Sequence, residues 1–214
     1  MPNPEVVAFP ATKRTFDVLV SAALLVLTAP LWAIIILAMT LEGALVASSR
    51  GKIFYRERRV SEGRIFMLNK FRVFKQESLA RAQAESGEIS TKELEKDGRN
   101  LTSTGRILRR VYLDELPQLW NVLVGEMTLV GPRPINLAVA ERHRAEGKTS
   151  KFIFRAGLTG YFQSHKGLKF DLEQEQADLQ YIDFCRRASA WKILLRDLQI
   201  IFISVYTVLR AEGI

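Results

Sequence analysis

The sequence predicts an α+β protein: a re-entrant membrane helix joined to a small helical domain with a short β-hairpin and interfacial amphipathic helices. The first observation is an uncharged run of 24 residues, Val18–Leu41. The second is a pair of segments rich in β-branched and aromatic residues around Ser61-Glu62-Gly63, and the third is a series of later helical patterns. At 214 residues the chain can hold one moderate domain. We therefore expect a single domain, with the membrane helix at about 14–42 and the rest of the fold at about 50–214.

The apolar run is long enough to cross a bilayer, yet two features favour a re-entrant path. Basic residues flank it on both sides, Lys13 and Arg14 before it and Arg50 with further cations after it. By the positive-inside tendency both ends prefer the cytoplasmic face. Pro30 lies near the middle and kinks the helix, so each arm reaches roughly 17 Å, about half the hydrocarbon thickness. A bitopic anchor is the alternative, and a signal peptide is disfavoured because the run exceeds the usual apolar region.

The remaining elements follow from local patterns. Strands are expected at Lys52–Val60 and Arg64–Phe74, and a charged surface excursion with one or two short helices at Gln76–Gly98. Further helices are expected at Leu137–Gly147, Ala177–Arg187 and Lys192–Leu209. In the last of these, apolar residues recur at helical spacing, which suits either a membrane interface or ordinary core packing.

Composition narrows the class of partner. The chain is 48% hydrophobic and 25% charged, with a formal net charge of +8. This surplus suits anionic lipid, phosphorylated substrates or nucleic acid. The basic residues cluster beside the apolar run without interleaved aromatic platforms, so we expect no nucleic-acid partner. Cys185 is the single cysteine, so no internal disulfide can form, and we interpret it as a small core residue.

An acid pair, Asp114-Glu115, is the most informative motif in the chain. Pro117 has no amide hydrogen and is tolerated only in the first turn of a helix, so a helix is predicted to begin near Asp114. Both carboxylates then lie where backbone N–H groups are unpaired and the helix dipole is positive. With Arg109 just upstream, the arrangement suits a metal ion and a phosphate. Helix capping by the two acids is the alternative reading of such a pair.

Other catalytic motifs are missing from the sequence. It has no HExxH zinc site, cysteine ligand set, P-loop or GxSxG elbow, so the common hydrolase and ATPase routes lack support. Carboxylates with arginines are the equipment of Mg²⁺-assisted phosphoryl chemistry, since a hard divalent ion takes oxygen ligands and neutralises phosphates. A carboxylate nucleophile can also form an acyl-phosphate intermediate.

Motifs on both sides of the acid pair extend this interpretation. They are Lys70-Phe71-Arg72 before it, Gly125-Glu126-Met127 and Val130–Pro134 after it, and Gly157–Gly160 with Gln163 further on. In this order the chain resembles the bacterial sugar transferases, more narrowly the monotopic polyprenyl-phosphate phosphoglycosyl transferases. With Lys13-Arg14 and Phe16-Asp17 before the apolar run, the resemblance covers nearly the whole chain.

The resemblance implies a covalent two-step transfer. Asp114 matches the nucleophile that attacks the sugar-bearing phosphorus of a UDP-sugar, and Glu115 matches its partner carboxylate. The acid pair is expected to hold Mg²⁺. Arg109 and Arg133 match arginines around the phosphates, with structural ion pairing to the acids as their alternative.

Two further cations and the partners come from the same resemblance. Lys70 and Arg72 are expected to reach nucleotide phosphate or lipid headgroups, with surface charges on a strand as an equal alternative. The implied partners are a UDP-sugar donor, a polyprenyl phosphate acceptor such as undecaprenyl phosphate, and the lipids of the bacterial inner membrane at its cytoplasmic face. The reaction would release UMP and begin glycan assembly on the lipid carrier.

The chain departs from the family pattern in three places. Ala29-Pro30 stands where a Ser-Pro pair is usual, Ala156-Gly157 where Pro-Gly is usual, and Ser164–Gly167 where a Gly-Arg pair is usual. If the last segment touches nucleotide or sugar, the donor preference differs from that of close relatives. An inactive, basic, membrane-docked scaffold is the alternative function, but it predicts an eroded acid pair. The identity of the UDP-sugar, the glycan pathway and homodimer formation stay open.

Overall fold

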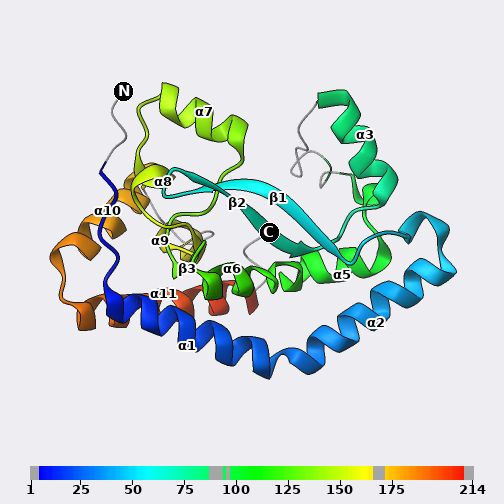
Figure 1. Cartoon of the computed structure of the whole chain (residues 1–214), viewed down its shortest axis with the longest axis horizontal. Coiled ribbons are helices and arrows are strands. Elements are labelled where there is room, and N and C mark those ends of the chain that lie inside the picture. Colours follow the sequence, from blue (N-terminus) through cyan, green and yellow to red (C-terminus); the bar gives the residue numbers. More distant parts are fainter. Residues whose placement is uncertain (1–4, 87–93, 95–96, 166–171, 210–214) are drawn as a thin grey trace. The chain divides into compact units, whose positions relative to one another are not determined.

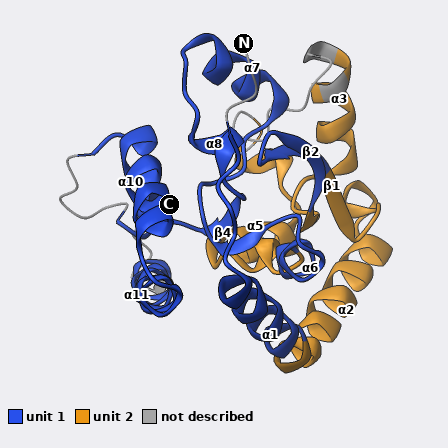
Figure 2. Cartoon of the chain, turned by 60° about the vertical axis from the view of Figure 1, so that its left-hand side comes forward, with its two compact units in different colours: residues 1–25, 57–68, 118–214 blue, residues 26–56, 69–117 orange. Residues whose placement is uncertain are grey.

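The computed structural model describes residues 5–86, 94, 97–165 and 172–209. Helices dominate, with two small two-stranded sheets, so the predicted α+β class is confirmed (Figure 1). The chain forms two compact units: unit 1 contains residues 1–25, 57–68 and 118–214, and unit 2 contains residues 26–56 and 69–117 (Figure 2). Each unit combines segments far apart in the sequence. The expected single domain stays a prediction.

Unit 1 is built around a short parallel pair of strands, β3 (Thr128–Val130) and β4 (Gly157–Thr159), which the sequence did not indicate. The long helix α11 packs against both strands and against α9. The described helices of this unit are α1 (Ala11–Leu27) up to Leu25, α6 (Gln118–Val124), α7 (Leu137–Ala145), α8 (Ser150–Ile153), α9 (Tyr161–Ser164), α10 (Gln174–Arg187) and α11 (Ala190–Leu209). Cys185 on α10 is buried, and this burial raises the pKa of its thiol to about 11, which supports its interpretation as a core residue.

A polar stripe fastens the start of α1 to unit 1. Lys13, Asp17 and Ser21 recur every four residues and therefore share one helix face, and each is 0% exposed. Lys13 forms an ion pair with Asp197 of α11, and Asp17 accepts a 2.6 Å hydrogen bond from the Thr128 hydroxyl of β3. Buried charges are stable only when paired, so these contacts fix the register of α1 against its unit.

Unit 2 has its own apolar core, which includes Ile35 and Met39 of α2 (Ala29–Leu45), Phe71 and Leu108. Its other elements are η1 (Ala47–Ser49), α3 (Gln76–Ser86), η2 (Gly98–Asn100), α5 (Ser103–Arg110) and η3 (Leu113–Glu115). The predicted surface excursion begins with α3, and most of its later part lies outside the described residues.

One carboxylate of α2 connects that helix to α5. Glu42 accepts hydrogen bonds from the backbone amides of Ser103 (2.7 Å) and Thr104 (2.9 Å) and from the Ser49 hydroxyl (2.8 Å). Amides of a first helical turn have no partner inside their own helix, so Glu42 satisfies two of them from outside. The end of the apolar run is thereby attached to unit 2.

The predicted hairpin is confirmed as β1 (Phe54–Ser61) and β2 (Arg64–Phe71). The two strands are joined by Glu62 and Gly63, with φ values of 49° and 72°. Two successive left-handed residues are characteristic of a type I′ turn, whose twist matches that of the strands.

The apolar run forms two helices that are separated at Thr28. Among the described helices, none alone has both the length and the hydropathy to cross a membrane; α1 and α2 reach that threshold only as a pair bent by 56°. Pro30 lies in the first turn of α2, where its missing amide breaks no intrahelical bond. The Trp32 indole donates to the Thr28 hydroxyl at 3.2 Å, so that hydroxyl is engaged at the break.

Candidate active site

The acid pair lies on a tight turn, which differs from the predicted helix start. After α5, Tyr112 adopts a left-handed conformation with φ 57°, and Leu113–Glu115 form the 3₁₀ turn η3. The following α-helix, α6, begins only at Gln118. Pro117 cannot donate a backbone hydrogen bond, so it interrupts the ladder and the regular helix starts after it. The acids therefore precede the helix.

The two carboxylates of the turn differ in exposure. Asp114 is buried, with 7% of its surface exposed. The Glu115 side chain is 15% exposed, and its Oε1 lies 3.1 Å from Nζ of Lys70 on β2. The structure thus brings together two of the residues that the sequence singled out from positions far apart in the chain. A lysine so placed offsets part of the negative charge of the acid pair.

Arg109 lies in the last turn of α5 and is half-buried. The backbone amides of Val111 and Tyr112 both bond to its carbonyl oxygen, so Arg109 belongs to the same turn that carries the acids. A cation at a helix C-terminus is stabilised by the helix dipole. This position is compatible with the predicted phosphate contact.

Arg72 has a different environment from Lys70. It is 3% exposed, and its guanidinium donates 2.7 Å hydrogen bonds to the carbonyl oxygens of Ser49, Lys52 and Phe74. Burial lowers the pKa of the guanidinium, while the Glu42 carboxylate opposes this shift. These contacts commit Arg72 to holding unit 2 together, so we leave it out of the proposed phosphate site.

In unit 1, the Gly-Pro-Arg-Pro and Gly-Leu-Thr-Gly motifs meet through their backbones. The Gly157 amide donates to the Pro132 carbonyl at 2.9 Å, and the Gly131 amide donates to the Thr159 carbonyl at 2.9 Å. A Cβ at Gly157 would lie 2.2 Å from the Gly131 nitrogen. Only glycine permits this approach, so the motif spacing records a packing requirement. Arg133 follows directly and is exposed.

The adjacent carboxylates of the acid pair are compatible in their chemistry with binding Mg²⁺. Across the described ranges no cluster of three or more histidine, cysteine, aspartate or glutamate side chains could hold a metal ion. Mg²⁺ is commonly bound through only one or two carboxylates, with substrate phosphates and water completing its shell. The adjacent carboxylates of Asp114 and Glu115 fit that mode because both supply hard oxygen ligands.

Sequence reasoning missed two residues that shape this unit. Glu42 is the first charged residue after the uncharged run, and a helix start is recognisable at Thr102-Ser103. Together these features could have indicated that Glu42 accepts hydrogen bonds from the free amides of that helix start. Tyr112 gave no signal, because a left-handed conformation is expected for glycine or asparagine and not for tyrosine.

The chain belongs to the bacterial sugar transferase family, whose model matches residues 9–211. More particularly, it is 32% identical over 200 residues to "UDP-glucose:undecaprenyl-phosphate glucose-1-phosphate transferase" of Escherichia coli, covering 91% of this chain and 39% of that relative. It is 31% identical to "Undecaprenyl-phosphate galactose phosphotransferase" of Salmonella typhimurium, covering 94% of this chain and 41% of the relative. It is 34% identical to "Exopolysaccharide production protein ExoY" of Rhizobium meliloti, covering 94% and 87%. The chain thus spans about two fifths of the first two relatives and most of the third.

Proposed function

We propose that this protein transfers a sugar 1-phosphate from a UDP-sugar to a polyprenyl phosphate and releases UMP, as the first membrane step of glycan assembly. The observation that carries the proposal is the turn that presents Asp114 and Glu115 beside Lys70, in a chain of the sugar transferase family. The names of the relatives from E. coli and S. typhimurium support undecaprenyl phosphate as acceptor, and that of ExoY supports a role in exopolysaccharide production.

In the proposed reaction a carboxylate oxygen of Asp114 attacks the sugar-bearing phosphorus of the donor. The bond from that phosphorus to the UMP oxygen breaks, and an aspartyl phosphosugar forms. A phosphate oxygen of the polyprenyl phosphate then attacks the same phosphorus, and the bond to Asp114 breaks to restore the carboxylate. The low exposure of Asp114 supports this role, because a carboxylate with few waters around it is a better nucleophile.

Neighbouring groups would prepare the donor for attack. Asp114 and Glu115 would hold Mg²⁺, which when bound neutralises the diphosphate charge. Lys70 holds the Glu115 carboxylate in place through their 3.1 Å pair. Arg109 and Arg133 would bind phosphate oxygens, for which a planar guanidinium is suited.

We further propose that α1 and α2 enter the cytoplasmic face of the bacterial inner membrane and return to it. Asp17 before the bend is bonded to Thr128, and Glu42 after it is bonded to Ser103. The chain from 103 to 128 has no apolar stretch long enough to cross a bilayer, so both ends of the helix pair belong on one side. Exposed apolar residues support lipid contact: Ile34, Leu37, Leu41 and Leu45 on α2, and Trp191, Leu195, Leu198 and Phe202 on α11.

Cysteine labelling tests this topology. In a Cys185→Ser background, Thr12→Cys and Arg50→Cys place single thiols at two exposed positions that flank the apolar run. We expect a membrane-impermeant maleimide to label both from the cytoplasmic side of inverted vesicles and neither from the outside of intact spheroplasts. Labelling of the two positions from opposite sides would establish a bitopic anchor instead.

Intact-mass spectrometry tests the proposed chemistry. After incubation with UDP-glucose or UDP-galactose and Mg²⁺, without acceptor, we expect a phosphosugar adduct on the wild-type chain and none on Asp114→Asn. Turnover of that variant should fall by about 10⁴-fold or more, as for loss of other catalytic nucleophiles. Asp183→Asn, which changes an exposed acid on α10, is the matched control and should keep both adduct and turnover. An adduct that persists in Asp114→Asn would place the nucleophile elsewhere.

A further inference from the structure

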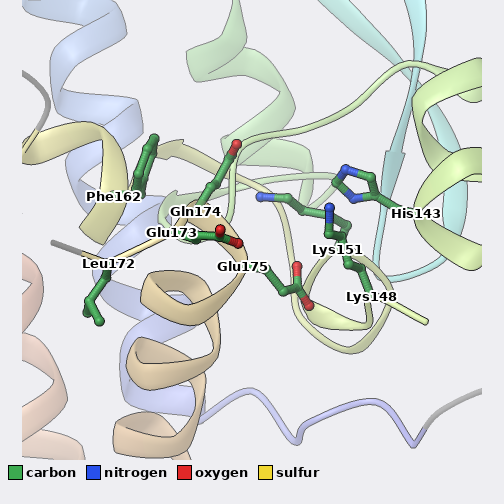
Figure 3. A pocket seen from close by; sticks show the side chains of 8 residues that line it. All are labelled: His143, Lys148, Lys151, Phe162, Leu172, Glu173, Gln174 and Glu175. Carbon is green, nitrogen blue, oxygen red and sulfur yellow. The ribbon is translucent and has the colours of Figure 1, made fainter. Parts of the chain in front are cut away.

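Unit 1 contains a hollow whose lining residues have no assigned role in the proposed transfer. Its volume is about 480 Å³, within the range of about 300–1,000 Å³ that is usual for small-molecule pockets. Figure 3 shows its lining, which comes from α7, the loop after it, α8, α9 and the start of α10. The lining residues are His143, Lys148, Lys151, Phe162, Leu172, Glu173, Gln174 and Glu175.

The charged residues of this lining are already engaged within unit 1. Lys151 forms a buried ion pair with Asp178, and Lys148 pairs with Glu146. Glu175 accepts hydrogen bonds from the Ser150 hydroxyl at 2.6 Å and from two backbone amides, and Glu173 caps α10. A phosphate needs cations that are free to bind it. Among the described lining residues, each lysine already has a carboxylate partner.

Two neutral side chains of the lining are not engaged in this way. Within the described parts of the chain, the buried Nδ1 of His143 has no hydrogen-bond partner, and the Gln174 carboxamide lines the same hollow. Burial, together with the nearby charges of Lys148 and Lys151, lowers the pKa of His143, which favours the neutral form of its ring. A neutral imidazole and a carboxamide each offer both a donor and an acceptor.

An aromatic ring completes the recognition groups. Phe162 lies on the opposite side of the hollow from His143, with Gln174 between them (Figure 3). It precedes by two residues the segment Ser164–Gly167, where the sequence departs from its family. The hollow thus combines an aromatic side chain with a few side chains that can donate and accept hydrogen bonds. This combination suits a ligand that contains a polar ring.

We propose that this hollow binds the ring of a neutral sugar. Sugar hydroxyls donate and accept at the same atom, which matches His143 and Gln174, and the C–H face of the ring can pack against Phe162. The sugar could belong to the donor, in which case the inference rests on the proposed function, or to a separate saccharide. The chemistry of recognition is the same for both sources.

Ligand-observed saturation-transfer NMR on the full chain in nanodiscs tests the proposal. The probes are methyl α-glucoside, methyl α-galactoside, UDP and inorganic phosphate. We expect at least one glycoside to bind, and Gln174→Ala to weaken it about five-fold, the value of one hydrogen bond. Phe162→Leu, which keeps an apolar side chain but removes the ring, should weaken it as well. Gln180→Ala, an exposed substitution on the same helix, is the matched control and should leave it unchanged.

Three results would overturn the assignment. The first is that neither glycoside binds, and the second is that a glycoside binds equally to Gln174→Ala and to the wild type. The third is that UDP or phosphate binds, no glycoside binds, and Gln174→Ala weakens the binding of that anion. This result would identify the hollow as an anion site.

A kinetic comparison separates the two sources of sugar. If the hollow holds the donor sugar, Gln174→Ala changes the ratio of kcat/KM for UDP-glucose and UDP-galactose. If it holds a separate saccharide, this ratio stays constant while glycoside binding is lost. The NMR experiment needs no turnover, so a missing glycoside signal in an active enzyme refutes only this inference. A bound glycoside in a chain that forms no Asp114 adduct refutes only the proposed transfer.

Discussion

The acidic turn of unit 2 and the glycine contact of unit 1 are both short motifs, but they depend on opposite parts of the residue. In the turn, the side chains of Asp114 and Glu115 carry the charge, and Tyr112 accepts an unfavourable backbone conformation next to them. In the contact, Gly131 and Gly157 contribute no side chain, and their value lies in how closely two backbones approach. A motif that looks equally specific in sequence can therefore encode chemistry in one place and packing in another.

The comparison predicts its largest effect on stability at the glycine contact. In Gly157→Ala the new Cβ would meet backbone atoms of Gly131 and Thr159, which cannot rotate away as a flexible side chain would. We expect a loss of about 3 kcal/mol in the free energy of unfolding, at the upper end for overpacking. Chemical denaturation measures it. Gly98→Ala is the control, since nothing lies within 4 Å of its Cβ position. A variant as stable as Gly98→Ala would show that the contact tolerates a side chain.

An intermediate effect, on activity, is expected at Arg133, which follows the glycine contact directly in the sequence. Pro132 and Pro134 fix φ on both sides of Arg133 and favour an extended backbone. Arg133→Lys keeps the charge but loses the planar fork, so kcat/KM should fall about ten-fold or more, since a hydrogen bond to a charged group is worth about 1.5–3 kcal/mol. The melting temperature should change little, because Arg133 is exposed.

Steady-state UMP release measures this effect, with Arg187→Lys, another exposed arginine, as control. Normal activity would mean that charge alone suffices. Unfolding of Arg133→Lys would mean that this arginine, like the glycines beside it, serves the fold.

The smallest effect is expected at the strained residue of the acidic turn. Asparagine tolerates a left-handed conformation, whereas a β-branched side chain does not. Tyr112→Ile should therefore be about 1 kcal/mol less stable than Tyr112→Asn, and the same ranking should hold for adduct formation if the turn orients Asp114. Thermal unfolding and the adduct assay together test this. Equal values for the two variants would indicate that the turn relaxes at no cost.

Local patterns predicted the hairpin and the helices α7, α10 and α11, because alternation, glycine stops and helical spacing are properties of neighbouring residues. The one-turn helices α8 and α9 were not predicted. The parallel strands β3 and β4 were not predicted, since each is three residues long and exists only through pairing across a distance in sequence. The predicted helix start near Asp114 was wrong because Pro117 cannot donate a backbone hydrogen bond, so the regular helix α6 begins only at Gln118.

The site residues show the same difference between features set by neighbouring residues and features set by contacts between distant residues. The acid pair was found from its own sequence, but its contact with Lys70 needed the strand that carries the lysine to be in place. The burial of Arg72 was invisible for the same reason: its three carbonyl acceptors come from residues 49, 52 and 74, and their convergence is a property of the folded unit.

The polar stripe of Lys13, Asp17 and Ser21 has a mechanical consequence in a bilayer. A free apolar helix responds to a thicker or thinner membrane by sliding along its axis or tilting. Here a slide by one turn would separate Lys13 from Asp197 and Asp17 from Thr128, leaving buried charges without partners. If the helix pair enters a bilayer as proposed, the stripe would fix the depth of α1, and any mismatch with the lipid would be absorbed at the Thr28 bend and in α2. Penetration depth would then be a property of the protein, the same in membranes of different thickness.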